Sequence, residues 1–115
     1  MSRNRSSIVA AKRRGHASLF AALGEETRLG LVTKLAQGQP RSISQLTEGS
    51  RLTRQAISKH LHVLETAGIV RSVRTGRENL FEFNPRPIDA MRQYLDFVSE
   101  QWDQALSRLK SFVER

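Results

Sequence analysis

Apolar residues recur at intervals of three and four along much of the chain, which places them on one side of an α-helix. In the first part of the sequence this spacing predicts a short helix over residues 16–23 and a second helix over residues 25–36. Glu25 begins the second helix, where the helix dipole favours negative charge. Gly38 and Pro40 follow it and are expected to end it.

The next two apolar stretches are short and lie close together. Residues 42–48 begin with a capping box, because Ser42 can cap the helix while Gln45 reaches back to the backbone of Ser42. Gly49 supplies a tight turn, and residues 53–66 form a fourth helix whose first residue, a threonine, is a good N-cap. Two short helices joined by a glycine-bearing turn are typical of a helix-turn-helix.

The pattern then changes from helical to extended. Residues 69–74 and 79–84 are rich in residues that favour strands, and the four residues 75–78 between them include a glycine. They predict a β-hairpin with Phe81 and Phe83 on one side. A helix-turn-helix followed by a hairpin is a winged helix. The predicted fold class is therefore mainly α with a small β-hairpin (α+β).

The last predicted helix covers residues 88–113, after Pro85 and Pro87 end the second strand. Its apolar residues repeat over nearly four heptads, longer than a helix needs to cover a domain of this size. One interpretation is a helix that lies across its own core, and the favoured one is a dimerisation helix. The apolar residues at this spacing are Ile88, Met91, Leu95, Val98, Trp102, Ala105, Leu109 and Phe112.

The charge is uneven. The 115 residues are enough for one domain, with a formal net charge of +8. Residues 1–14 hold five basic residues and no acid, and we expect them to form a flexible basic tail before a domain over residues 15–115. Residues 41–83 hold all of the remaining excess, seven basic against four acidic residues. This distribution favours a polyanionic partner, most simply nucleic acid, although a solvated basic surface would have the same composition.

The fourth helix separates apolar from polar residues. On a helical wheel Ile57, Leu61 and Leu64 fall in one sector and are expected to pack on the third helix. The opposite side carries amide, basic and hydroxyl groups with no acid among them, and these groups suit the edges of bases and phosphates in the major groove of DNA. The candidate contacts to bases or phosphates are Thr53, Arg54, Gln55, Ser58, Lys59 and His62.

Three further residues are candidate backbone contacts. Arg74 and Arg77 flank the hairpin turn at Gly76, so the tip could reach phosphates or an adjacent minor groove. His60 lies at the edge of the apolar sector, and we expect it to contact the DNA backbone or to pack at the helix boundary rather than to bind a metal. Together, the helix and the wing predict binding to double-stranded DNA.

The chain also resembles a known family. The run of residues 23–35 is LGEETRLGLVTKL, and residues 42–83 read SISQLTEGSRLTRQAISKHLHVLETAGIVRSVRTGRENLFEF. Both are similar to the arsenic-repressor (ArsR) family of bacterial winged-helix transcription factors, over roughly residues 16–112. The resemblance implies a homodimeric repressor of transcription that reads a pseudo-palindromic operator. It also implies an interface built by the first and last helices, here Leu19, Phe20, Met91, Leu95, Val98, Trp102, Leu109 and Phe112.

Many members of that family release DNA on binding metal, and this sequence departs from their metal sites. Ser42 and Ser44 stand where the family has thiolates, and the chain has no cysteine. His60 and His62 are about 200° apart on a helix and cannot share one ion. The last helix has no histidine and only these acids as candidate ligands: Asp89, Asp96, Glu100 and Asp103. We therefore expect no metal or other cofactor, and the effector is not evident.

Other functions have weaker support. The Ser-x-x-Lys match at residues 107–110 lacks its companion motifs, and all seven glycines are isolated, so no phosphate-binding loop and no enzyme is expected. Binding of RNA or a protein partner, or of DNA without sequence preference, remains the alternative. RNA is disfavoured because the aromatic residues Phe81, Phe83 and Trp102 are expected to face inward rather than to stack on bases.

No apolar run reaches the ~20 residues that cross a bilayer. Although basic, serine-bearing starts also occur in organellar transit peptides, the basic run at residues 12–14 interrupts any secretory signal. A cytoplasmic protein without membrane contact is therefore expected.

Overall fold

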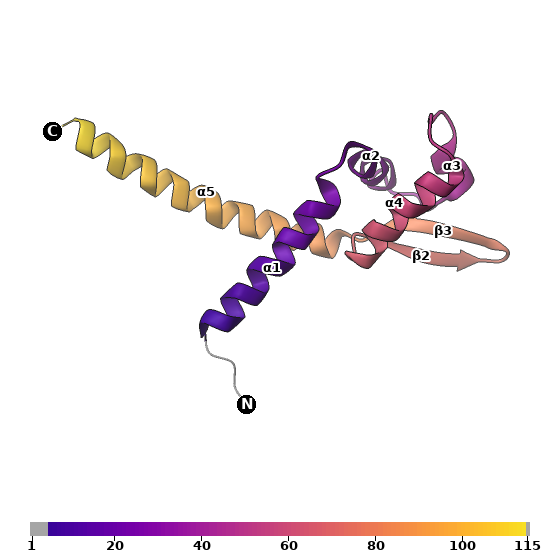
Figure 1. Ribbon diagram of the computed structural model, residues 1–115, viewed down its shortest axis with the longest axis horizontal. Helices are drawn as coiled ribbons and strands as arrows, with labels where there is room; N and C mark the ends of the chain where they lie inside the picture. Colours follow the sequence, from indigo (N-terminus) through magenta and orange to yellow (C-terminus); the bar gives the residue numbers. More distant parts are fainter. Residues whose placement is uncertain (1–4, 115) are drawn as a thin grey trace.

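A computed structural model describes residues 5–114, with side-chain positions from residue 11 onward. It contains five helices and three short strands within that range, arranged as Figure 1 shows. In chain order these are α1 (Arg5–Leu23), α2 (Glu26–Leu35), β1 (Arg41–Ser42), α3 (Ile43–Thr47), α4 (Arg54–Thr66), β2 (Val70–Thr75), β3 (Glu78–Phe83) and α5 (Pro85–Val113).

The helix-turn-helix has the capping contacts that the sequence predicts. The Ser42 hydroxyl accepts a hydrogen bond from the backbone N–H of Gln45 at 3.2 Å, and the Gln45 side chain accepts from the backbone N–H of Ser42 at 2.9 Å. The Thr53 hydroxyl accepts from the backbone N–H of Ala56 at 3.1 Å and so begins α4. Gly49 has a φ of 73°, which a side chain would disfavour.

The sheet has one strand more than the predicted hairpin. The strand order is β1-β3-β2, and both pairs are antiparallel. β2 and β3 form the wing, in which Val70 pairs with Phe83. The two-residue strand β1 pairs with the other edge of β3, where Arg41 lies opposite Phe81. Because β1 is so short and runs directly into α3, no alternating pattern identifies it in the sequence.

The core lies between α4, α2, α3 and the sheet. As predicted, α4 turns Ile57, Leu61 and Leu64 inward. Phe81 is buried and Phe83 half-buried, so the predicted inward side of the wing is confirmed. In α2, Leu31 is buried whereas Leu29 is 52% exposed. The largest fully buried side chains are Leu35, Leu46, Ile57, Leu61, Leu64, Ile69 and Val70.

Two helices begin earlier than predicted. α1 begins at Arg5 rather than at residue 16, so residues 5–14, expected to be a flexible tail, are helical, and residues 1–4 lie outside the described range. No proline interrupts this stretch, and its alanines favour helix although its apolar spacing is irregular. α5 begins at Pro85 rather than Ile88, since proline is tolerated in the first helical turn.

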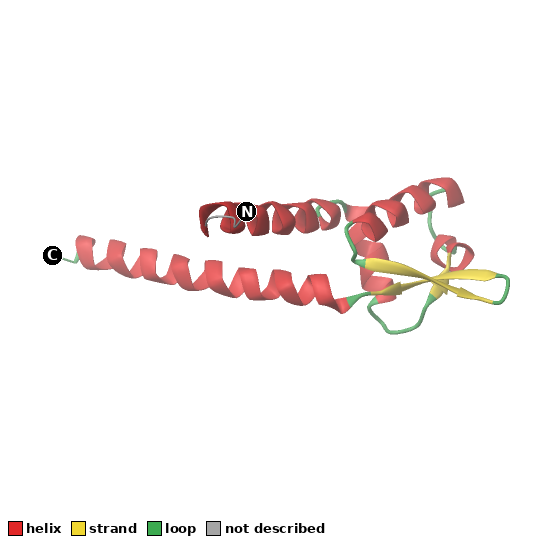
Figure 2. Ribbon diagram, turned by 90° about the horizontal axis from the view of Figure 1, so that it is seen from below, coloured by secondary structure: helices red, strands yellow, loops and turns green. Residues whose placement is uncertain are grey.

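The molecule has two layers, seen from the side in Figure 2. α1 and α4 lie in one layer, and the wing and α5 lie beneath them. α5 extends far beyond the rest of the molecule, with the C-terminus at its far end in Figure 1. Across residues 5–114, no helix has the length and apolar character needed to cross a membrane.

Candidate nucleic-acid interface

The outer side of α4 is free of intramolecular packing. Because the inner residues of this helix are buried in the core, the outer residues point to solvent. Every candidate on this side is exposed, namely Thr53, Arg54, Gln55, Ser58, Lys59 and His62. Among the described residues, neither Arg54 nor Lys59 pairs with a carboxylate. The helix therefore presents its basic and amide groups unpaired.

Thr53 combines two roles. Its hydroxyl oxygen accepts the backbone N–H of Ala56 and caps the helix. A hydroxyl also has one proton to donate. The capped conformation thus leaves an O–H group at the N-terminus of α4 that can donate to an anion, where the helix dipole also favours negative charge.

His60 is held inside the protein rather than on the outer side of α4. Its Nδ1 lies 3.3 Å from the Arg28 guanidinium and 3.6 Å from the Glu25 carboxylate. The ring is half-buried at the boundary between α4 and the start of α2. This position agrees with packing at the helix boundary, one of the two roles expected for His60, and contact with the DNA backbone stays a prediction.

Glu25 fixes this contact through the N-terminus of α2. Its carboxylate accepts the backbone N–H groups of Thr27 at 3.0 Å and Arg28 at 2.9 Å. These two backbone hydrogen bonds, with a smaller contribution from His60, hold the pKa of Glu25 below its ordinary value. The ionised carboxylate therefore caps α2 and faces α4.

Arg28 is a structural residue that sequence reasoning missed. Its Nε donates to the carbonyl oxygen of Ala22 at 2.6 Å, and its guanidinium reaches His60. One side chain thus joins the end of α1 to α2 and α4. In the sequence, Arg28 is simply a basic residue on an amphipathic helix, so no local signal identifies this contact.

The wing has two free arginines and one paired arginine. Arg71 lies opposite Glu82 in the β2–β3 register and forms an ion pair with it at 2.7 Å. Arg74 and Arg77 are exposed, and within the described range neither pairs with an acid. Gly76, with a φ of 62°, allows the tight turn between them. The tip of the wing therefore carries positive charge at the same end of the molecule as α3 and the start of α4 (Figure 1).

The candidate dimer residues divide into two groups in the single chain. Met91 is buried, and Leu19, Phe20 and Val98 are half-buried near the crossing of α1 and α5. The other four candidates lie on α5 and are exposed in the single chain, as residues of a seam between two chains would be before association. Their exposed fractions are Leu95 50%, Trp102 66%, Leu109 58% and Phe112 71%.

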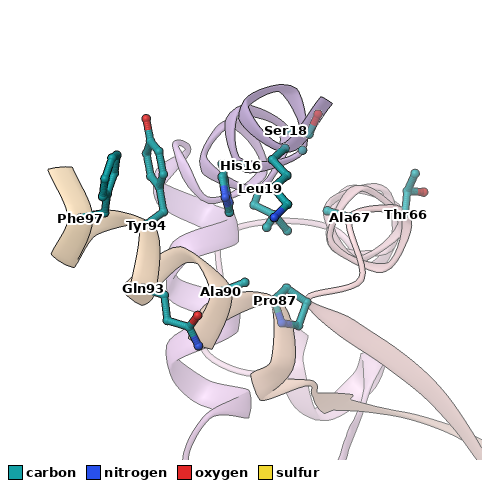
Figure 3. A pocket seen from close by; sticks show the side chains of 12 residues that line it. His16, Ser18, Leu19, Thr66, Ala67, Pro87, Ala90, Gln93, Tyr94 and Phe97 are labelled. Atoms are coloured by element: carbon teal, nitrogen blue, oxygen red, sulfur yellow. The ribbon is translucent and has the colours of Figure 1, made fainter. Parts of the chain in front are cut away.

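A pocket of about 760 Å³ opens where α1, α5 and the end of α4 meet. Figure 3 shows Tyr94 and Phe97 rising from α5 on the left, with His16 and Leu19 of α1 to their right. The rings of His16 and Tyr94 stack with their centroids 4.6 Å apart. This pocket borders the exposed apolar residues of α5.

The described residues contain no group of three or more histidine, aspartate or glutamate side chains placed to hold a metal ion. His60 and His62 project from different sides of α4: His60 points into the protein and His62 to solvent.

Comparison with known proteins agrees with this geometry. A family model described as a helix-turn-helix domain matches residues 23–73. The HTH-type transcriptional regulator YuzN of Bacillus subtilis is 38% identical over 77 residues, covering 62% of this chain and 84% of YuzN.

Two solved structures extend the similarity to nearly the whole chain. An ArsR-like transcriptional regulator from Rhodococcus sp. RHA1 is 33% identical, with a TM-score of 0.79 over 89% of this chain and 95% of that one. The homodimeric winged helix-turn-helix domain of Mb0332 from Mycobacterium bovis shares the fold at 21% identity, with a TM-score of 0.62 over 93% of each chain. The chain described here belongs to the ArsR family of winged helix-turn-helix transcriptional regulators.

Proposed function

We propose that this regulator is a dimeric repressor that reads a pseudo-palindromic DNA operator through α4 and the β2–β3 wing. The observation that carries the proposal is the outer side of α4, whose basic and amide side chains are exposed and not paired with an acid, next to a positively charged wing tip. Such a helix fits the major groove, while the wing reaches the flanking backbone.

Each side chain has a chemical role in this arrangement. Gln55 can form two hydrogen bonds with an adenine edge, and Lys59 can donate to the O6 and N7 atoms of guanine. His62 lies on the same side of α4 and faces the neighbouring bases. Arg74 and Arg77 bind phosphates or enter the adjacent minor groove, so they set affinity and register rather than sequence preference.

The dimer is supported by the apolar residues at the end of α5. Trp102, Leu109 and Phe112 are each more than half exposed in the single chain, at heptad-like spacing. An apolar stripe of this kind is characteristic of an interaction surface. Two-fold symmetry would then present two α4 helices to two half-sites on one side of the duplex.

Repression, rather than activation, rests on membership of the family and on the repressor activity implied by the resemblance. We further propose that the protein acts without a metal, without a catalytic activity and in the cytoplasm. The two positions that carry thiolates in metal-sensing relatives are Ser42 and Ser44, whose hydroxyl groups are poor ligands for the soft metals that thiolates bind.

The test is binding to a labelled duplex taken from upstream of the protein's own gene, titrated beside a shuffled duplex of equal length over a salt series, with and without zinc. We expect a preference of tenfold or more, about 1.4 kcal/mol, for the native duplex, and no effect of zinc. Equal binding that weakens equally with salt would contradict sequence-specific recognition. An RNA competitor that displaces the duplex would favour RNA as the ligand.

Substitutions identify the reading side of α4. Gln55→Ala and Lys59→Ala should each narrow the gap between native and shuffled DNA by about 1–3 kcal/mol. The matched control is Gln37→Ala, an exposed residue just beyond α2 and outside α4. If both α4 variants leave the gap unchanged, the outer side of α4 is not the reading surface.

A further inference from the structure

The helical state of residues 5–14 changes what their positive charge can do. On a flexible tail, basic residues contribute to DNA affinity wherever they stand in the sequence, because none of them has a fixed direction. On a helix, each residue has a fixed direction. α1 has no acid in its sequence, and its basic residues at positions 12, 13 and 14 are all exposed.

Arg14 lies on the stripe of α1 that, further along the helix, borders α4. Ser18 and Ala21, one and two turns further along the same stripe, line a groove with His62 and Thr66 of α4. Arg14 is thus about 6 Å along the helix axis from Ser18, in line with this groove.

Lys12 lies on a different side of the same helix. With His16 and Leu19 it lines the pocket between α1 and α5, and Figure 3 shows those two side chains there. Lys12 and Arg14 are two residues apart and so about 160° apart around the helix. Lys12 and Arg14 therefore face different neighbours.

The layers of the fold place Arg14 near DNA bound to α4. α1 and α4 lie in the same layer in Figure 2, with α5 and the wing beneath. The inner residues of α4 point into the core, and its exposed residues His62 and Thr66 border the groove. DNA lying on α4 would pass over this groove at the C-terminal end of the helix.

We propose that α1 is a second, rigid DNA-contacting element, in which Arg14 binds a backbone phosphate of the strand that passes the C-terminal end of α4. The proposal rests on the DNA-binding mode proposed above. A guanidinium suits this contact because it remains charged and can donate two parallel hydrogen bonds to one phosphate. No acid on α1 competes for it, and Arg14 has no ion pair within the described range.

A matched pair of substitutions tests this placement. Arg14→Gln and Lys12→Gln remove the same charge from positions two residues apart. The equilibrium dissociation constant for the native duplex is measured for both variants over a salt series. Arg14→Gln should weaken binding about tenfold. It should also reduce the slope of log K against log salt concentration by about 2, because each protomer of the dimer loses one phosphate contact. Lys12→Gln should change binding less than about twofold and leave the slope unchanged.

Three results would overturn the proposal. Equal losses for both variants would mean that the positive charge acts regardless of direction, as on a flexible tail. No loss for Arg14→Gln would mean that DNA does not reach α1. A change in the sedimentation coefficient of Arg14→Gln would mean that Arg14 acts through assembly instead of DNA.

The same titrations separate this proposal from the function on which it rests. Arg14→Gln should lower affinity for native and shuffled duplexes alike, because a phosphate contact carries no sequence information. Lys59→Ala should lower the preference between them. If Lys59→Ala has no effect while Arg14→Gln weakens both duplexes, α1 contacts DNA but the reading side of α4 was misassigned.

Discussion

Trp102→Ala is the sharpest test of how α5 is used. In the single chain Trp102 is 66% exposed, and all residues of α5 from Ser99 onward are exposed. Its removal therefore cannot leave a cavity in the core of the monomer. Any large effect of the substitution must come from a partner that covers this part of α5.

The size of the effect follows from the exposed area. A fully buried aromatic side chain removes roughly 150–250 Å² from water, so about 100–165 Å² at Trp102 remains to be covered. At ~25 cal/mol per Å² this contributes about 2.5–4 kcal/mol per protomer. A two-fold symmetric dimer contains two copies, or about 5–8 kcal/mol. Because ordering the interface and the remaining alanine offset part of this, the dimer dissociation constant should rise about a hundredfold or more.

Sedimentation equilibrium over a range of protein concentrations measures this constant directly. Gln104→Ala is the matched control, because Gln104 lies with Ser107, Arg108 and Ser111 on the polar side of the same helix. The control should dimerise like the unmodified protein. If Trp102→Ala dimerises with an unchanged dissociation constant, the end of α5 is not in the interface. The proposed arrangement of two α4 helices over two half-sites then loses its basis.

Two further predictions concern stability. Leu64→Ala removes a fully buried side chain on the inner side of α4, with 0% exposure, and should lower the free energy of unfolding by about 2–5 kcal/mol. A loss below about 1 kcal/mol in urea denaturation would contradict the assigned core. The backbone hydrogen bonds from Thr27 and Arg28 lower the pKa of Glu25 in the folded protein below its ordinary value of 4.5. The ionised carboxylate therefore stabilises the fold at pH values above the pKa of the unfolded chain. This stabilisation is lost as the pH falls through the lower pKa of the folded protein. Glu25→Gln should therefore lower the Tm at pH 7, and the difference from the unmodified protein should shrink on acidification; a difference independent of pH would refute the cap.

The helix-turn-helix could be predicted from sequence because its signals are local. Ser42 with Gln45, and Thr53 three residues before Ala56, satisfy backbone groups within one turn of the chain. The apolar sector of α4 is likewise set by spacing alone. The sequence alone therefore predicts the boundaries of α3 and α4 and the outward direction of Gln55 and Lys59.

The features that sequence reasoning missed depend on contacts between distant segments. β1 is a strand only because Arg41 pairs with Phe81, 40 residues away in the chain. Packing of His60 at the helix boundary was one of two expectations, but its partners Glu25 and Arg28, more than 30 residues earlier in the chain, could not be identified. The start of α1 was missed for a different reason: residues 5–14 carry little apolar periodicity, and their charge was taken as a sign of disorder although their helix propensity is adequate.

The end of α5 depends both on a local signal, its apolar spacing, and on contacts beyond the single chain. Its heptad spacing predicted a long helix correctly, because periodicity does not depend on what covers the apolar side. Yet a helix segment of about 15 residues without tertiary contacts is only marginally stable in water. The apolar stripe at Trp102, Leu109 and Phe112 must therefore be covered for this segment to hold its shape. In this protein, folding of the last turns of α5 and association of two chains should be one process, which explains why the strongest periodicity in the sequence lies where the single chain has the least core.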